Sequence, residues 1–179
     1  GNFPIADLAG GALSAAMSIL AALFDAQRSG QGRFIDVSMT DCAMALNTQP
    51  LASLHSWKQP LPAGHDTLSG ALPSYGTYAT ADGRYLAVGA LEPKFWQAFC
   101  AAAGCPELSK SGWAAGKSGA AVKAQVARII QARTLAEWTQ TLAGVDACVS
   151  PVLRIDEVLS HPHTQARAMT VNTPLPDGS

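Results

Sequence analysis

The sequence has little charge and few aromatic side chains, and this shortage limits what the protein can bind. Only 14% of its 179 residues are charged and 7% are aromatic. The net charge is -1, so no basic field favours nucleic acid or an anionic membrane surface as a partner. A hydrophobic content of 48% predicts a globular chain, long enough for one large domain or two small ones.

Cysteine is also scarce. The four cysteines are Cys42, Cys100, Cys105 and Cys148. They form neither a Cys-x-x-Cys pair nor a zinc-binding spacing, so we expect buried free thiols in a reducing cytoplasm. His161 and His163 have no cysteine nearby and a proline between them, which predicts a surface turn and no metal site.

A long segment near the start of the chain has no charge at all. Residues 8–24 approach the lower length limit of a membrane span, but they are rich in Ala, Gly and Ser, and Asp7 and Asp25 flank them. We therefore expect a closely packed helix of a soluble protein over residues 8–28, with no signal peptide. Four apolar side chains have the spacing of one buried face: Leu13, Met17, Leu20 and Phe24.

The first third of the chain has the rhythm of a layered α/β domain. Gly30 and Gly32 end the long helix, and the β-branched and aromatic residues 33–39 predict a strand. Asp41 can cap a second helix over about 42–54. A lone strand cannot form a parallel sheet, so we expect the other strands to lie upstream.

The pattern changes after a linker-like segment at residues 56–70. Two strand-like runs, 75–80 and 85–90, flank Asp82-Gly83, which is a strong hairpin signal. Three further helices are expected: residues 94–103 after Pro93, residues 120–131, and a segment from the capping box Thr134–Glu137 through Leu142. A strand is expected at 148–153 and a helical turn at 156–159.

Taken in order, these signals resemble the class III CoA-transferase family (CaiB/BaiF type), and within it the α-methylacyl-CoA racemase branch. The matching segments cover nearly the whole chain. They are Asp7-Leu8-Ala9-Gly10-Gly11, residues 30–39, 68–75, 81–85, 88–95 and 146–152, and His161-Pro162-His163 with Arg167.

The resemblance implies an α/β fold: a partial Rossmann-like large domain followed by a small α+β domain of the class III CoA-transferase fold. Residues 1–55 would form the second part of the large domain, and residues 56–74 a linker. Residues 75–168 would form the small domain, and 169–179 the start of a return linker. The family also implies an interlocked homodimer, and we expect this chain to begin midway through the large domain.

The resemblance assigns roles to individual residues as well. Racemases of the family place a histidine and an aspartate on opposite faces of the α-carbon, and Asp7 matches that aspartate. Glu92 matches a glutamate that supports the catalytic pair across the dimer. Substrate-binding roles are implied for Tyr75, which would line the acyl pocket, for Leu91, and for Gly10 and Gly11, which would let the substrate approach the backbone.

Each of these residues also has a simpler interpretation. Aspartate is among the best helix caps, so Asp7 can be a cap, and Glu92 can be a solvated or capping acid. Tyr75 can be a packing residue of a strand. The family histidine belongs to a Gly-His-Asp motif expected upstream, so we interpret Gly64-His65-Asp66, which lies in the linker, as a coincidence.

The expected function is that of an acyl-CoA racemase or epimerase, which transfers a proton at the α-carbon of a 2-methylacyl-CoA thioester with no metal or redox cofactor. One alternative is a CoA-transferase in which Asp7 attacks the thioester. Transferases of the family tend to have a glycine-rich loop near the small domain. Residues 68–73 contain one glycine, which favours the racemase. A second alternative is a truncated domain that is inactive by itself.

Overall fold

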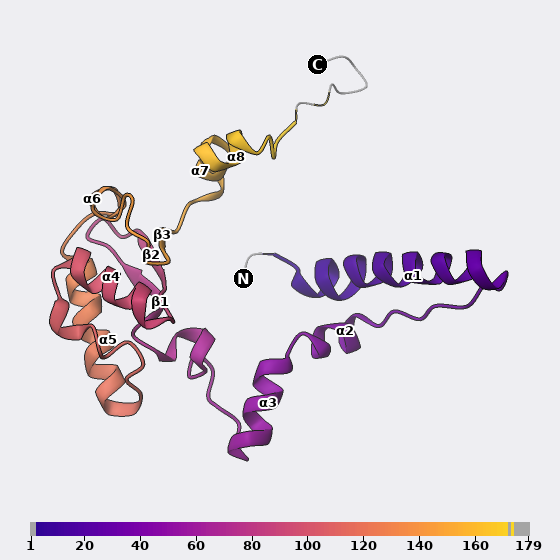
Figure 1. Cartoon of the computed structure of the whole chain (residues 1–179), viewed down its shortest axis with the longest axis horizontal. Helices are drawn as coiled ribbons and strands as arrows, with labels where there is room; N and C mark the ends of the chain where they lie inside the picture. The colour runs from indigo at the N-terminus through magenta and orange to yellow at the C-terminus, as the bar shows by residue number, and fades with distance from the viewer. Residues whose placement is uncertain (1–2, 172, 174–179) are drawn as a thin grey trace. The chain divides into compact units, whose positions relative to one another are not determined.

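The structure is a computed structural model that describes residues 3–171 and 173, and it divides into two compact units (Figure 1). The first unit is Gly1–Pro62 and the second is Ala63–Ser179, so the division falls inside the predicted linker at 56–74. The predicted return linker at 169–179 lies partly outside the described residues.

A long helix opens the first unit, as the sequence predicts. It begins with the π-helical segment η1 (Ala6–Leu13) and continues as α1 (Ser14–Ser29). Gly30 ends it at a φ of 72°, and its N–H donates to the Ala26 carbonyl at 2.8 Å. A left-handed residue at this position is the usual helix stop, and glycine adopts it without a Cβ clash.

The prediction that one face of this helix is buried is wrong for the described residues. Leu13, Met17, Leu20 and Phe24 are between 62% and 71% exposed, and α1 contains no buried residue. The helix over Ala6–Ser29 is long and apolar enough to cross a membrane, but core helices of soluble proteins meet the same criterion. Its apolar face is therefore a surface that the first unit leaves uncovered.

The predicted strand at residues 33–39 is wrong as well. Residues 31–38 are irregular and pair with no strand, and α2 (Met39–Ala45) begins at the end of the run. Its cap is Ser38, whose side chain accepts from the Asp41 N–H at 3.2 Å, so Asp41 is not the cap. Strand propensity measures how well side chains fit a sheet, and the first unit supplies no neighbouring strand among its described residues.

The second predicted helix is divided in two. After α2, the helix α3 (Thr48–Trp57) begins at Asn47. Pro50 has no N–H to donate to the Leu46 carbonyl and its ring would clash with that carbonyl, so a continuous helix through this point is disfavoured. In α3 the same proline lies in the first turn, where no N–H is required.

The second unit contains a small antiparallel sheet in the order β1-β2-β3. Its strands are β1 (Tyr75–Ala79), β2 (Tyr85–Gly89) and β3 (Val149–Pro151). The register places Tyr75 opposite Gly89, and Thr77 opposite Ala87. The predicted hairpin is confirmed, with Gly83 at a φ of 71° in the turn.

Helices pack on one face of this sheet (Figure 1). They are α4 (Pro93–Ala103), α5 (Gly116–Gln131) and α6 (Leu135–Thr141), with the short η3 (Pro106–Leu108) after α4. All three helices were predicted and are confirmed. The core includes Leu86, Val88, Trp96, Phe99, Val126, Ile130 and Trp138, each 3% exposed or less. Apolar burial of this kind is the main favourable term in folding, and it is concentrated in the second unit.

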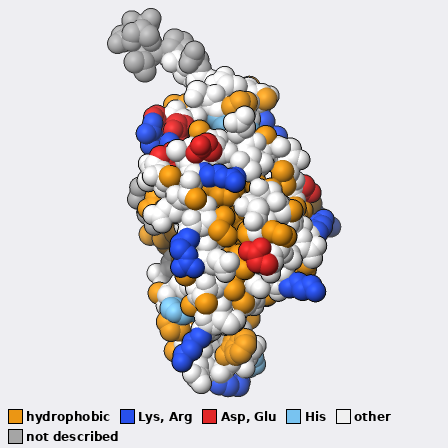
Figure 2. Space-filling model, turned by 90° about the vertical axis from the view of Figure 1, so that its left-hand side faces the viewer, with side chains coloured by type: hydrophobic (Ala, Val, Ile, Leu, Met, Phe, Trp, Pro, Cys, Tyr) orange, Lys and Arg blue, Asp and Glu red, His pale blue; other side chains and the backbone are white. Residues whose placement is uncertain are grey.

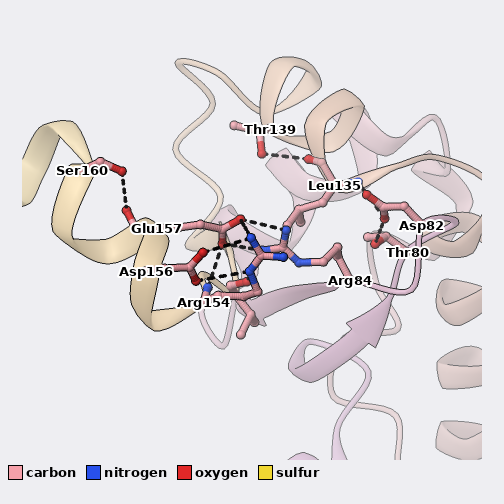
Figure 3. A network of polar contacts seen from close by, with 10 residues as sticks. Thr80, Asp82, Arg84, Leu135, Thr139, Arg154, Asp156, Glu157 and Ser160 are labelled. Atoms are coloured by element: carbon pink, nitrogen blue, oxygen red, sulfur yellow. Dashed lines mark hydrogen bonds and ion pairs between the residues drawn. The ribbon is translucent and has the colours of Figure 1, made fainter.

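Polar contacts connect the hairpin to the helices around it (Figure 3). The Asp82 carboxylate accepts from the Thr80 hydroxyl at 2.5 Å and from the Leu135 N–H at 3.2 Å, so the hairpin turn caps α6. Thr134 and Glu137 form the predicted capping box at the same helix end. Two further helices, α7 (Ile155–Ser160) and α8 (Pro162–Ala166), follow β3.

Candidate functional site

Asp7 lies inside the long helix, so the interpretation of this residue as a cap is wrong. It is the second residue of η1, and the cap position belongs to Ile5, with no side-chain hydrogen bond. Its carboxylate is exposed in the first turn, where free N–H groups and the helix dipole favour negative charge. The surrounding turns are π-helical, a conformation that is rare and frequent at functional sites.

Gly10 and Gly11 bring the long helix against α2. A Cβ on Gly10 would lie 2.9 Å from the Met39 carbonyl oxygen, closer than real Cβ contacts, and Gly10 is buried. A Cβ on Gly11 would meet the Met39 side chain at 3.3 Å. The Gly10 position is thus filled by α2, and its absent side chain permits close helix packing. A role for either glycine in substrate contact stays a prediction.

Tyr75 lines a pocket of about 540 Å³ in the second unit. The pocket lies over the face of the sheet opposite the core: Thr77, Ala87 and Ser150 form one row across the three strands. Leu86 and Val88 belong to the core, although Val88 also borders the pocket. The lining residues are Leu68, Ser69, Gly70, Tyr75, Gly76, Thr77, Ala87, Val88, Gly89, Lys123, Cys148 and Ser150. Tyr75 is half-buried at the start of β1, so its ring forms part of the pocket wall.

Leu91 and Glu92 lie at the same end of the hairpin as Tyr75. Tyr75 pairs with Gly89, and the chain leaves β2 there and reaches Leu91 two residues later. Glu92 is the N-cap residue of α4, but its side chain does not cap the helix, so the capping-acid interpretation is wrong. Its backbone carbonyl accepts from the Phe95 and Trp96 N–H groups at 3.0 and 3.2 Å. The exposed carboxylate is free to face a ligand.

Tyr75, Leu91 and Glu92 lie in the second unit, and Tyr75 alone of these three lines the pocket. Asp7, Gly10 and Gly11 lie in the first unit. Support of the catalytic pair by Glu92 across a dimer stays a prediction.

Sequence reasoning missed several residues around this site. Ser74 is fully buried, and its hydroxyl donates to the Gly112 carbonyl at 2.8 Å. The Lys123 ammonium donates to the Gly70 carbonyl and so joins α5 to η2 (Thr67–Ala71) at the edge of the pocket. No local pattern marks Lys123. Trp113 could have been noticed from the sequence, because it is a single large aromatic residue in the otherwise irregular segment 105–119.

The thiols only partly match the expectation of burial. Cys100 and Cys105 are buried, but Cys148 is exposed, lines the pocket and has a φ of 51°. A hydrogen bond between the two buried sulfurs raises the pKa of the Cys100 thiol and lowers the pKa of the Cys105 thiol.

Two motifs that the sequence analysis set aside have local structural roles. Asp66 begins η2 through a capping box, and His65 lies 3.0 Å from the Ala63 carbonyl, within a turn. The His161 ring accepts from the His163 N–H at 3.2 Å and so caps α8. Across residues 3–171 and 173, no three His, Cys, Asp or Glu side chains gather as metal ligands.

Surface charge is mixed where Figure 2 displays it. Basic and acidic side chains alternate there among hydrophobic and neutral ones. The mixed charge on this face agrees with the net charge of -1. It favours a small molecule over a polyanion as the ligand.

The fold and the sequence place the chain in one protein family. The chain belongs to CoA-transferase family III, whose model matches residues 1–179. It is 38% identical over 175 residues to a mouse protein named alpha-methylacyl-CoA racemase, a match that covers 92% of this chain and 43% of that protein. It is 30% identical to a succinate–glutarate CoA-transferase of Agrobacterium fabrum, with 98% and 44% covered.

Solved structures show the same fold. A crystal structure of a Mycobacterium tuberculosis protein, Rv3272, matches with a TM-score of 0.72 at 24% identity, over 94% of this chain and 44% of that chain. The fold is therefore the α/β fold of this family. The chain spans less than half the length of these relatives.

Proposed function

We propose that this chain is part of an acyl-CoA racemase or epimerase that moves a proton at the α-carbon of a 2-methylacyl-CoA thioester. The observation that carries this proposal is the 38% identity to the mouse racemase over 92% of the chain, against 30% to the transferase. Both relatives act on CoA thioesters by their names, so the substrate class is common to the two candidate reactions.

Asp7 is proposed as one of the two proton-transfer groups. Removing an α-proton and returning one on the other face needs two acid–base groups, each worth about 10²–10⁴-fold in rate. The exposure of Asp7 and its lack of a capping hydrogen bond support this assignment, because the carboxylate is not committed to capping the helix. The second group is proposed to be a histidine outside this chain.

Glu92 is proposed to support that pair from the small unit. Its carboxylate is exposed and its backbone is fixed by the start of α4, which favours a defined position for a charged group. In a homodimer, Glu92 of one copy would complete the site that contains Asp7 of the other. The interlocked dimer is part of the proposal.

Tyr75 and Leu91 are proposed to contact the acyl group. Tyr75 lines the pocket of about 540 Å³, a volume within the range of small-molecule sites, and Leu91 lies two residues beyond Gly89, which lines it as well. The pocket wall combines aliphatic carbon with a few hydroxyl groups and the Lys123 ammonium. Neither a metal nor a redox cofactor is needed for an α-proton transfer, and none is proposed. A cytoplasmic location, acyl-CoA as the small-molecule partner, and inactivity of the 179 residues by themselves complete the proposal.

The second candidate is a CoA-transferase, supported by the similarity to the Agrobacterium enzyme. Asp7 would attack the thioester carbonyl and expel CoA thiolate, which would then attack the resulting anhydride. The products of that second attack are the free acid of the donor and an aspartyl-CoA thioester. The single glycine at 68–73 and its contact with Lys123 favour the racemase, because a flexible glycine-rich loop is absent from that segment.

Two measurements on the full-length protein separate the candidates. When the protein is incubated with a 2-methylacyl-CoA in deuterated water, the substrate should gain one deuterium at the α-carbon. Mass spectrometry or NMR measures this incorporation. A lack of incorporation would reject the racemase. Hydroxylamine trapping of an adduct on Asp7 in the presence of an acyl-CoA and an acceptor acid would establish the transferase instead.

A further inference from the structure

Trp113 is placed beside the two site residues that follow β2. Its indole Nε1–H donates to the Leu91 carbonyl oxygen at 2.6 Å. That carbonyl belongs to the peptide group that joins Leu91 to Glu92. The tryptophan therefore holds the peptide plane that immediately precedes the Glu92 side chain.

The loop that carries Trp113 is itself held firmly. The Gly112 carbonyl accepts from both the hydroxyl and the N–H of Ser74, at 2.8 and 3.3 Å. A Cβ on Gly112 would lie 2.8 Å from Cδ1 of the buried Trp96, so the loop packs directly on the core. The Ala114 N–H closes a turn on the Ser111 carbonyl at 3.1 Å. A donor on such a loop has little freedom to move.

Ser74 joins this loop to both edges of the site. Its own carbonyl accepts from the Ala90 N–H at 2.9 Å, and Tyr75 is the next residue along the chain. Ser74 is fully buried and directly precedes Tyr75. Its hydrogen bonds therefore connect the start of β1 to Ala90, which precedes Leu91, and to Gly112 in the loop of Trp113. Buried polar networks whose members are all satisfied fix one arrangement of the chain.

Glu92 is then fixed from both sides. On its C-terminal side, its carbonyl accepts the first N–H groups of α4, from Phe95 and Trp96. On its N-terminal side, Trp113 holds the Leu91 carbonyl. Within the part of the chain that the structure describes, the Glu92 carboxylate makes no hydrogen bond or ion pair, so its position depends on this backbone.

We infer that Trp113 is a positioning residue for Glu92: its indole N–H sets the orientation of the Leu91–Glu92 peptide and thereby aims the carboxylate. This inference rests on the proposed function of Glu92. It also explains why a large ring that is 57% exposed has its one polar atom bonded to the backbone. The ring itself is not assigned a contact with the substrate.

The test is the variant Trp113→Phe in the full-length enzyme, which keeps a ring and removes the donor. We expect kcat for α-deuterium exchange to fall about 10-fold, because the Glu92 carboxylate loses its defined orientation, while KM stays within about twofold. The melting temperature should stay near that of the unaltered protein. Trp57→Phe is the matched control, since Trp57 is 69% exposed in the other unit, and it should leave all three values unchanged.

Two results would overturn the inference. One is a kcat of Trp113→Phe equal to that of the unaltered enzyme; a loss of activity only in Trp113→Ala would then assign the role to the ring. The other is a parallel fall of kcat and melting temperature in Trp113→Phe, which would make Trp113 merely structural.

A second readout does not depend on racemase activity. Hydrogen exchange of the Phe95 and Trp96 amides in the substrate-free protein should be faster in Trp113→Phe than in the unaltered protein, because their acceptor is the Glu92 carbonyl. Unchanged exchange would overturn the inference even if the enzyme proved to be a transferase. A lack of α-deuterium exchange by the unaltered enzyme would reject only the proposed function.

Discussion

The Arg84 guanidinium binds both carboxylate oxygens of Glu157, at 3.0 and 2.6 Å (Figure 3). Arg84 ends the hairpin turn and Glu157 lies in α7, so this pair joins two segments 73 residues apart in sequence. Glu157 also accepts from the backbone N–H of Arg154 at 2.8 Å. That second bond is local to the start of α7, and α7 contains no buried residue, so the Arg84–Glu157 pair is what joins the helix to the hairpin.

Replacing Arg84 by methionine should release α7 from the hairpin. The substitution keeps an aliphatic stem and removes the two-pronged ion pair, which adds geometric definition as well as energy. Hydrogen exchange of the α7 amides should become several-fold faster, whereas the amides of β1 and β2 should keep their protection. Arg128→Met, at an exposed position in α5, is the control; equal effects of both variants would contradict the attachment.

Acidification should release α7 from the hairpin, as Arg84→Met does. The hydrogen bonds from Arg84, and then from the Arg154 N–H, lower the pKa of Glu157 below its usual range. A lowered pKa in the folded state gives stability that is present above the unfolded pKa of about 4.3 and is lost as the pH falls through the lowered value. Protection of α7 should therefore decrease below about pH 4. In Glu157→Gln, we expect the α7 amides to be weakly protected at neutral pH and to change little on acidification. If this variant showed the same acid transition as the unaltered protein, Glu157 would not be the responsible group.

Gly112 is predicted to be a site where one methyl group is costly. Its Cβ would lie 2.8 Å from the ring of Trp96, which is 2% exposed and cannot move aside. Gly112→Ala should lower the free energy of unfolding of the second unit by about 1–3 kcal/mol, measured by chemical denaturation of the full-length protein. Gly32→Ala, where a Cβ would meet no atom within 4 Å, should cost much less. Equal costs would show that the loop of Trp113 does not pack as described.

Local signals in the sequence predicted the second unit well. The Asp82-Gly83 hairpin and the capping box at Thr134 each depend on residues that lie within a few positions of one another. Such contacts are determined by backbone geometry and by hydrogen bonds that need no distant partner. The unit also buries its own core, so the apolar pattern of its helices agrees with their exposure.

The first unit was predicted less well for a physical reason. The expected burial of Leu13, Met17, Leu20 and Phe24 and the expected strand at 33–39 both require surfaces that the described first unit does not supply. A periodic apolar face indicates where a helix can pack, and a β-branched run indicates where a strand can pair. Neither pattern supplies the partner, and this chain spans less than half the length of its relatives.

The candidate site was predictable only in part, because its residues come from separate segments. Sequence motifs marked Asp7, Tyr75 and Glu92, each within a short characteristic run. Trp113 reaches Leu91 across 22 positions, and Lys123 reaches Gly70 across 53. These long-range hydrogen bonds depend on the packing of α4, η3 and α5, which no short motif records.

The substitution Asp7→Asn tests the catalytic proposal most directly. The amide has nearly the same shape as the carboxylate but cannot act as a base, so α-deuterium exchange should fall by about 10²–10⁴-fold. The melting temperature should hardly change, because the Asp7 side chain caps no helix and is exposed. Asp36→Asn, which also alters an exposed acid in the first unit, is the control and should retain activity. A loss of thermal stability that accounts for the lost activity would show that Asp7 stabilises its helix and takes no part in proton transfer.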